Sequence, residues 1–231
     1  MAFIPPSCCG AGYFSRLRRA LGDRVDFRAV ELPGHGRRYR EAPLTAASAA
    51  TADAAARIHD AVGTVGTGGT VDAVYGESLG AYVALAVTAL LSGPGGPLLL
   101  AASNSPPSVR ERIPVEDVHS VGAAIALLTA MGGRIPPELA DRPEVARQAL
   151  PLMRADLALS QSFIELTRTS ATGGDLVVLA GTDDRALTGL DAWAAHALGR
   201  CHVVRLPGGH LLSATNPAGV ADVILRSVGT G

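Results

Sequence analysis

Short, almost continuously apolar runs recur along the chain, each soon followed by Gly, Pro, Ser or Asp. Each run has four to eight residues, a length that favours a strand over a helix. Strands without polar alternation are typical of parallel sheets that are covered on both faces. The expected strands are Ala2–Pro5, Val25–Leu32, Val71–Tyr75, Leu98–Ala102, Leu176–Ala180 and His202–Leu206.

Longer stretches with helical spacing of their apolar residues separate these runs. The last of them begins with Asn216-Pro217, a capping residue followed by the proline that favours a first helical turn. Strands that alternate with helices predict an α/β fold: a mostly parallel central sheet of about six or seven strands, with helices on both faces. The expected helices are Tyr13–Leu21, Ala46–Val62, Leu79–Leu91, Leu190–Leu198 and Pro217–Val228.

One segment, Ser105–Arg168, interrupts the alternation with helical patterns and proline-rich breaks alone. An insertion after the carboxyl end of a strand lies over the place where such sheets bind ligands. We therefore expect one domain, residues 1–231, in which residues 105–168 form a helical lid. Gly132-Gly133 either ends the first lid helix or serves as its hinge. The expected lid helices are Ala123–Met131, Arg142–Ala155 and Leu157–Leu166.

The strongest motif is a G-x-S-x-G, Gly76-Glu77-Ser78-Leu79-Gly80, between an expected strand and an expected helix. That context is typical of a nucleophile elbow. The turn is so tight that a β-carbon at either glycine would collide with the neighbouring strand or helix. We predict that Ser78 is a nucleophile at the start of a helix, where developing negative charge is favoured. A glycine-rich turn without chemistry is the alternative.

A serine nucleophile needs a base, and His210 has the most suitable position of the six histidines. It follows the last expected strand on a glycine-rich loop, as the chain order Ser, Asp, His of an α/β-hydrolase fold requires. His35, on the loop after the second expected strand, is the alternative. His59 and His196 fall within helical patterns and are expected at the surface.

The base must be oriented by an acid. Asp183 and Asp184 both follow the strand expected at Leu176–Ala180. The first residue after such a strand is usually spent on the turn, so Asp184 is the predicted acid and Asp183 the alternative.

Backbone N–H groups are expected to stabilise the oxyanion. Leu79, which follows the nucleophile, should supply one of them. The other should come from the loop after the first strand, where Pro5 and Pro6 have no N–H to give. Ser7 is the first candidate and Cys8 the second.

Composition excludes several other classes of protein. The net charge is −1, aromatic residues make up 4%, and no basic, aromatic-interleaved stretch indicates nucleic-acid binding. The longest apolar run is too short to span a membrane, and no signal peptide is recognised. Three cysteines without metal-type spacing indicate free thiols in a reducing compartment, so a cytoplasmic protein without metal or other cofactor is expected.

With these residues placed, the chain resembles the type II thioesterases of polyketide and nonribosomal peptide synthesis over nearly its whole length. Met131–Glu138 and Leu150–Asp156 are similar to the family's lid motifs, which read Gly-Gly-x-x-Pro-Pro-Glu and Leu-Pro-x-x-Arg-Ala-Asp. Glu31–Arg37 is similar to its loop after the second strand. The family usually has Ala-Gly-Gly where this chain has Ser7-Cys8-Cys9, and His where it has Glu77.

The resemblance implies hydrolysis of acyl groups from the phosphopantetheine arm of an acyl or peptidyl carrier protein. A free-standing esterase or acyl-CoA thioesterase with the same triad is the alternative, and a binding protein that has lost activity is another. We expect a monomer with no nucleic-acid or membrane partner. The arginines that could contact an acidic carrier are Arg37, Arg38, Arg40, Arg110, Arg112 and Arg134, although a solvated charge run would look the same.

Overall fold

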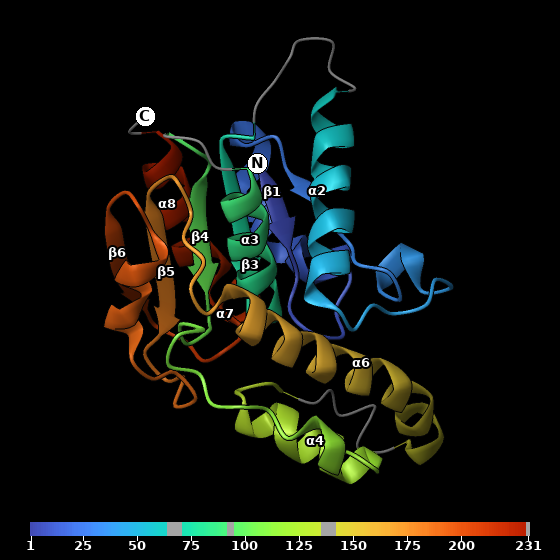
Figure 1. Cartoon of the computed structure of the whole chain (residues 1–231). Helices are drawn as coiled ribbons and strands as arrows, with labels where there is room; N and C mark the ends of the chain where they lie inside the picture. The colour runs from blue at the N-terminus through green and yellow to red at the C-terminus, as the bar shows by residue number, and fades with distance from the viewer. Residues whose placement is uncertain (64–70, 92–94, 135–141, 230–231) are drawn as a thin grey trace.

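The computed structural model describes residues 1–63, 71–91, 95–134 and 142–229. Its centre is one sheet of six strands, all parallel, in the order β2-β1-β3-β4-β5-β6 (Figure 1). The two middle strands are in register from Ala73 opposite Leu98 to Glu77 opposite Ala102. The strands are β1 (Ala2–Ile4), β2 (Arg28–Ala29), β3 (Ala73–Glu77), β4 (Leu98–Ala102), β5 (Leu176–Gly181) and β6 (Cys201–Leu206).

Helices cover both faces of the sheet, which explains why its strands are apolar throughout. On one face α2 (Ala47–Gly63) and α3 (Leu79–Leu90) pack over β1, β3 and β4. On the other face α1 (Ser15–Leu21) packs beside α8 (Pro217–Val228). The side chain of Asn216 accepts a hydrogen bond from Gly219 N–H and caps α8. The α/β-hydrolase class predicted from the sequence is confirmed.

Between β4 and β5 runs a segment, residues 103–175, that we call the β4–β5 segment; its described part contains no strand of the sheet. Its two longer helices are α4 (Val121–Ala130) and α6 (Pro143–Thr167), and they lie beneath the carboxyl ends of the strands as Figure 1 is drawn. The helix α6 packs on α2, α3 and α4.

Several boundaries differ from the sequence prediction. The helices expected at 142–155 and 157–166 are one continuous helix, α6. The predicted break fell at Asp156, but this acid is buried within the helix and does not interrupt it. The strand expected at 25–32 is only the two-residue β2, which pairs with a three-residue β1. The helix expected at 190–198 is a 3-10 helix, η5 (Leu190–His196).

The start of the first helix also differs. A 3-10 turn, η1 (Ala11–Phe14), leads directly into α1. Near the carboxyl end of the chain, one short helix, α7 (Leu212–Thr215), precedes α8. Of the helices in the described ranges, none is long and apolar enough to cross a membrane.

Candidate active site

The G-x-S-x-G motif forms the turn between β3 and α3. Ser78 has φ of +56°, in the left-handed region, as expected of a strained turn that presents its side chain. A β-carbon at Gly76 would overlap the carbonyl of Gly80, and one at Gly80 would overlap the carbonyl of Ile4 in β1. Both glycines are therefore required for steric reasons, and together they place Ser78 at the carboxyl edge of the sheet.

Ser78, His210 and Asp184 form one hydrogen-bonded chain. Ser78 Oγ lies 3.0 Å from His210 Nε2, and His210 Nδ1 lies 2.8 Å from Asp184 Oδ2. The His210 side chain is 6% exposed and that of Asp184 is 1% exposed. Since Nδ1 faces a carboxylate, it carries the ring proton, which leaves Nε2 free to accept the serine proton. The loops after β5 and β6 thus bring both partners to the nucleophile.

The two aspartates after β5 differ in their surroundings. Asp184 Oδ1 accepts a hydrogen bond from Ala186 N–H, which fixes the carboxylate that faces His210. Asp183 is exposed, and its carboxylate lies 3.4 Å from the hydroxyl of neighbouring Thr182. The geometry places Asp184, and not Asp183, at the imidazole.

The other histidines lie elsewhere. His59 is exposed, as expected. His196 is buried, contrary to the surface position expected for it, because its ring hydrogen-bonds to Ser170 and Ser108, and burial lowers its pKa. Both hydrogen-bond partners belong to the β4–β5 segment, far along the chain, so the local helical pattern carries no signal of this burial.

Leu79 and Ser7 carry the two backbone N–H groups predicted to stabilise the oxyanion. Leu79 begins α3, and within the described residues neither its N–H nor that of Ser7 has a hydrogen-bond acceptor. Cys8 N–H, the second candidate, donates to Asp156 Oδ2 at 2.6 Å, and Cys9 N–H donates to Pro6 O at 3.2 Å. Of the two candidates in this loop, Ser7 is therefore the one with an uncommitted N–H.

The loop after β1 contains an unusual residue at Cys8, whose φ is +60°. A residue other than glycine in this region costs about 1–2 kcal/mol, whereas a hydrogen bond to a charged acceptor contributes about 1.5–3 kcal/mol. The bond to Asp156 is thus strong enough to maintain the strained backbone. Partial burial, and the nearby carboxylates of Asp156 and Glu77, raise the pKa of the Cys9 thiol to about 12, so it remains a neutral thiol.

His35, the alternative base, lies in a buried pair with Asp156. Its Nε2 is 3.0 Å from Asp156 Oδ2, and its Nδ1 is 3.0 Å from the carbonyl oxygen of Pro33. Burial lowers the pKa of His35, but the hydrogen bonds to Asp156 and to the carbonyls of Pro33 and Leu32 outweigh it and raise the pKa. Because both ring nitrogens face acceptors, His35 has no lone pair to offer a substrate.

Glu77 precedes the nucleophile, but its carboxylate points away from Ser78 and is buried. It accepts hydrogen bonds from the hydroxyls of Tyr13 at 2.8 Å and Tyr75 at 3.0 Å, and from Ser213 N–H at 3.2 Å. Burial raises the pKa of Glu77, although these hydrogen bonds oppose the shift. The residue therefore links β3 to η1 and to α7, just after His210.

A cavity of about 360 Å³ lies beside the imidazole. Its walls come from the end of α4 and from the loops of Asp184 and His210, and Arg134 and Arg185 also line it.

Gly132 ends α4 with φ of +95°, and a β-carbon there would overlap the His210 ring. Gly132 N–H and Gly133 N–H donate to Thr129 O and Leu128 O, so this pair closes the helix. Residues 135–138 of the first lid motif, Met131–Glu138, lie outside the described residues.

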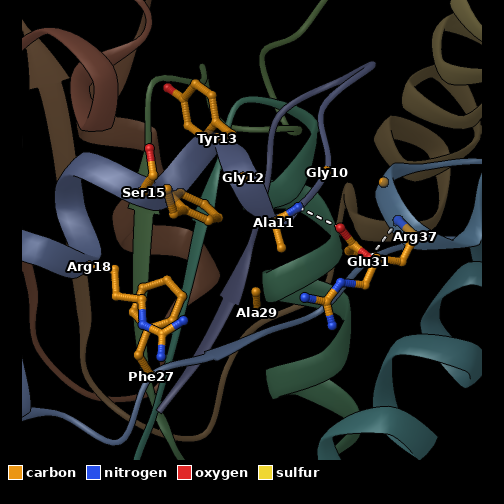
Figure 2. A pocket seen from close by; sticks show the side chains of 12 residues that line it. Gly10, Ala11, Gly12, Tyr13, Ser15, Arg18, Phe27, Ala29, Glu31 and Arg37 are labelled. Carbon is orange, nitrogen blue, oxygen red and sulfur yellow. Dashed lines mark hydrogen bonds between the residues drawn. The ribbon is translucent and has the colours of Figure 1, made fainter.

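A second, larger cavity of about 810 Å³ lies away from Ser78, between η1 and the β2 edge of the sheet (Figure 2). On its wall, Glu31 accepts hydrogen bonds from Ala11 N–H at 2.7 Å and Arg37 N–H at 3.0 Å, which ties the β1 loop to the β2 loop. Within the described ranges, no three His, Cys, Asp or Glu side chains are grouped so that they could hold a metal ion.

Comparison with known proteins places this geometry in a family. The family model described as thioesterase domain matches residues 1–228. A human protein, S-acyl fatty acid synthase thioesterase, medium chain, is 30% identical over 162 residues, which is 67% of this chain and 60% of that protein. This chain thus matches well under two thirds of the length of its curated relative.

Solved structures share the fold. RedJ, a thioesterase from prodiginine biosynthesis in Streptomyces coelicolor, has a TM-score of 0.78 and 21% identity, covering 99% of this chain and 84% of RedJ. ClbQ from the colibactin NRPS/PKS pathway has a TM-score of 0.83 and 19% identity, covering 99% and 96%. YbtT, a type II thioesterase from the yersiniabactin pathway, has a TM-score of 0.78 and 22% identity, covering 99% and 92%. By the family model that spans it almost from end to end, this chain belongs to the thioesterase family.

Proposed function

We propose that this protein is a serine thioesterase that removes acyl groups from the phosphopantetheine arm of acyl or peptidyl carrier proteins in polyketide or nonribosomal peptide synthesis. The observation that carries the proposal is the buried chain Ser78–His210–Asp184 in a member of the thioesterase family. The likeness in fold to RedJ, ClbQ and YbtT supports the carrier-bound substrate.

The proposed reaction has two steps, acylation of Ser78 and hydrolysis of the acyl-enzyme, and the same residues act in both. Ser78 Oγ attacks the thioester carbonyl carbon while its proton passes to His210 Nε2, and the N–H groups of Leu79 and Ser7 stabilise the oxyanion. The carbon–sulfur bond then breaks, and His210 returns the proton to the departing thiol. Water, deprotonated by His210, releases the acid and restores Ser78. Asp184 holds the imidazole in the required tautomer throughout.

The β4–β5 segment would serve as the lid of a single domain comprising residues 1–231, with its lid portion at about residues 105–168. Its helices α4 and α6 lie at the carboxyl end of the sheet (Figure 1), and a β-carbon at Gly132 would overlap the His210 ring. The cavity beside His210 is suitable for the departing thiol arm, because that group must leave from the side of the proton donor. Gly132 belongs to the helix end, so we do not assign it the role of a hinge.

The proposed carrier would meet exposed arginines. Arg37, Arg40 and Arg134 are exposed, whereas Arg38 is paired with Asp53 and Glu41. Arg112 is exposed but paired with Glu116, and Arg110 is half-buried. An acidic carrier surface would be attracted to Arg37, Arg40 and Arg134. The three free thiols of this protein suit a reducing compartment, so we propose a cytoplasmic monomer.

The test compares one acyl group carried by a holo carrier protein and by coenzyme A, with wild type and Ser78→Ala. We expect kcat/KM to be at least about 10-fold higher for the carrier and to fall with salt for that substrate alone. Ser78→Ala should be inactive on both. Equal kcat/KM values would favour the acyl-CoA thioesterase alternative. Failure of a fluorophosphonate to label Ser78 would favour a binding protein.

A further inference from the structure

Asp156 is a buried acid that the proposed reaction does not use. Its side chain is 0% exposed, on the lid helix α6, within the Leu-Pro-x-x-Arg-Ala-Asp motif. Among the described side chains, its Oδ1 is one of two buried polar atoms without a hydrogen-bond partner. Burial of an acid with one oxygen unpaired costs free energy. Stability alone therefore does not explain an acid at this position.

The other oxygen, Asp156 Oδ2, joins three parts of the molecule. It accepts Cys8 N–H from the β1 loop at 2.6 Å and faces His35 Nε2 from the β2 loop at 3.0 Å. The carboxylate itself belongs to α6. Cys8 and Asp156 are 148 residues apart in the chain, and His35 and Asp156 are 121 apart. Both contacts are direct, so the position of α6 is transmitted to the β1 loop without an intermediate side chain.

The backbone of Cys8 makes this contact relevant to Ser7. Because φ at Cys8 is +60°, the left-handed conformation needs an external constraint, which the bond to Asp156 provides. If that bond were lost, a change of φ at Cys8 would turn the preceding residues and move Ser7 N–H relative to Ser78. The bond also keeps Cys8 N–H turned toward α6 and away from the site.

We infer that Asp156 is a positioning residue for the oxyanion hole: by binding Cys8 N–H, with His35 as its second partner, it sets the direction of Ser7 N–H. This inference rests on the proposed function. It gives Asp156, in the second lid motif, and His35, which is not the proposed base, a role in positioning the β1 loop. It also makes oxyanion stabilisation depend on the seating of α6 over the site.

The direct test is Asp156→Asn, which preserves size. Both hydrogen bonds of Asp156 end on one oxygen, and an amide oxygen in its place lacks the negative charge that strengthens both of them. We expect kcat on a carrier-bound thioester to fall about 10- to 100-fold, less than the loss of an oxyanion donor outright, with KM within about twofold. Ser160→Ala, buried one turn further along α6, is the matched control and should retain wild-type kcat.

A second variant separates positioning from simple destabilisation. Adding Cys8→Gly to Asp156→Asn removes the steric cost of the left-handed backbone, so the loop no longer needs the carboxylate. We expect the double variant to recover at least about fivefold of the lost kcat. Thermal unfolding of each variant, followed by circular dichroism, checks that the fold is retained.

Three results would overturn the inference. They are an unchanged kcat in folded Asp156→Asn, a loss confined to KM, and a kcat that Cys8→Gly fails to restore in a folded double variant. Each leaves the proposed function standing, provided that wild type is active and Ser78→Ala is not. If wild type itself is inactive on thioesters, the proposed function fails before the variants are compared.

Discussion

The protein contains two buried His–Asp pairs at the carboxyl end of its sheet. His210 and Asp184 are joined at 2.8 Å, and His35 and Asp156 at 3.0 Å. All four side chains are at most 6% exposed. Distance and burial therefore do not distinguish the two pairs. The difference lies in the second nitrogen of each imidazole: His210 faces the hydroxyl of Ser78, while His35 faces the carbonyl of Pro33.

That second partner determines what each histidine can do. A hydroxyl can donate its proton, so the nitrogen opposite can act as a base. A carbonyl can only accept, so the nitrogen opposite must keep a proton. The rise in the pKa of His35 agrees with this arrangement. The partner opposite the acid, more than the acid itself, is therefore what distinguishes His210, the proposed base, from His35.

The strongest test of this comparison exchanges each histidine for glutamine. His210→Gln should lower kcat by about 10⁴-fold or more, since His210 is the group that hydrogen-bonds to Ser78 Oγ among the described residues. His35→Gln can still donate to Asp156 through its amide and should lower kcat by about 10-fold or less. Both are measured on the same thioester substrate. Losses of similar size would mean that the two pairs act as one unit.

The acids offer a second, smaller contrast. Asp184→Asn should lower kcat about 10³- to 10⁴-fold, because the amide favours the wrong tautomer of His210. Asp183→Asn, one residue earlier and exposed, should stay within about twofold. Single-turnover acylation rates give the cleanest comparison. If Asp183→Asn were the damaging change, the loop after β5 would have to rearrange in solution.

The sequence predicted the parts of this site that depend on local rules. Ser78 could be identified because a G-x-S-x-G between strand and helix has one common use. His210 and Asp184 follow from their places after β6 and β5, since parallel strands bring their carboxyl ends to one edge. The order of these elements along the chain was sufficient, and no long-range contact had to be known.

The sequence could not predict contacts between distant loops. The pairing of His35 with Asp156 depends on how α6 packs across α2 and α3. The same uncertainty produced the predicted break between residues 155 and 157, because a buried acid in the middle of α6 does not fit an amphipathic pattern. Glu77 directly precedes Ser78 in the sequence, yet its carboxylate binds the hydroxyls of Tyr13 and Tyr75.

The close approach of Gly132 to His210 gives a third prediction. At Gly132→Ala the new methyl would overlap the imidazole, and φ of +95° is unfavourable for alanine. We expect kcat to fall about 10- to 100-fold through displacement of His210, less than its removal costs. Gly122→Ala is the matched control, since its β-carbon meets nothing closer than Ser120 Oγ at 3.9 Å. It should keep wild-type kcat and stabilise α4 slightly. Wild-type kcat in Gly132→Ala would show that α4 does not contact His210 in solution.

The smallest effect is expected at Glu77, a buried acid that, unlike Asp184 and Asp156, has no histidine partner. It accepts hydrogen bonds from two tyrosine hydroxyls and one backbone N–H. A glutamine can replace it, because its oxygen accepts from Tyr13 and Ser213 while its amide donates to the Tyr75 oxygen. Tyr75 can then donate to Ser213 Oγ, which lies 2.9 Å away. We expect Glu77→Gln to differ from wild type by about 1 kcal/mol or less at pH 5.

The pH dependence of unfolding distinguishes this acid from the paired ones. Because burial raises the pKa of Glu77 in the folded protein, the folded state binds its proton more tightly than the unfolded chain does. Its favourable contribution is complete below the ordinary glutamate pKa of 4.5 and is lost as pH rises through the folded pKa. Glutamine does not titrate, so Glu77→Gln should gain stability over wild type as pH increases from 5 to 8. Glu116→Gln supplies a control that should stay nearly flat, since hydrogen bonds from Arg112 lower the pKa of the exposed Glu116 and its contribution changes mainly below the ordinary glutamate pKa of 4.5. Urea unfolding at both pH values measures the difference, and parallel curves for Glu77→Gln and wild type would show that Glu77 does not change its protonation on folding.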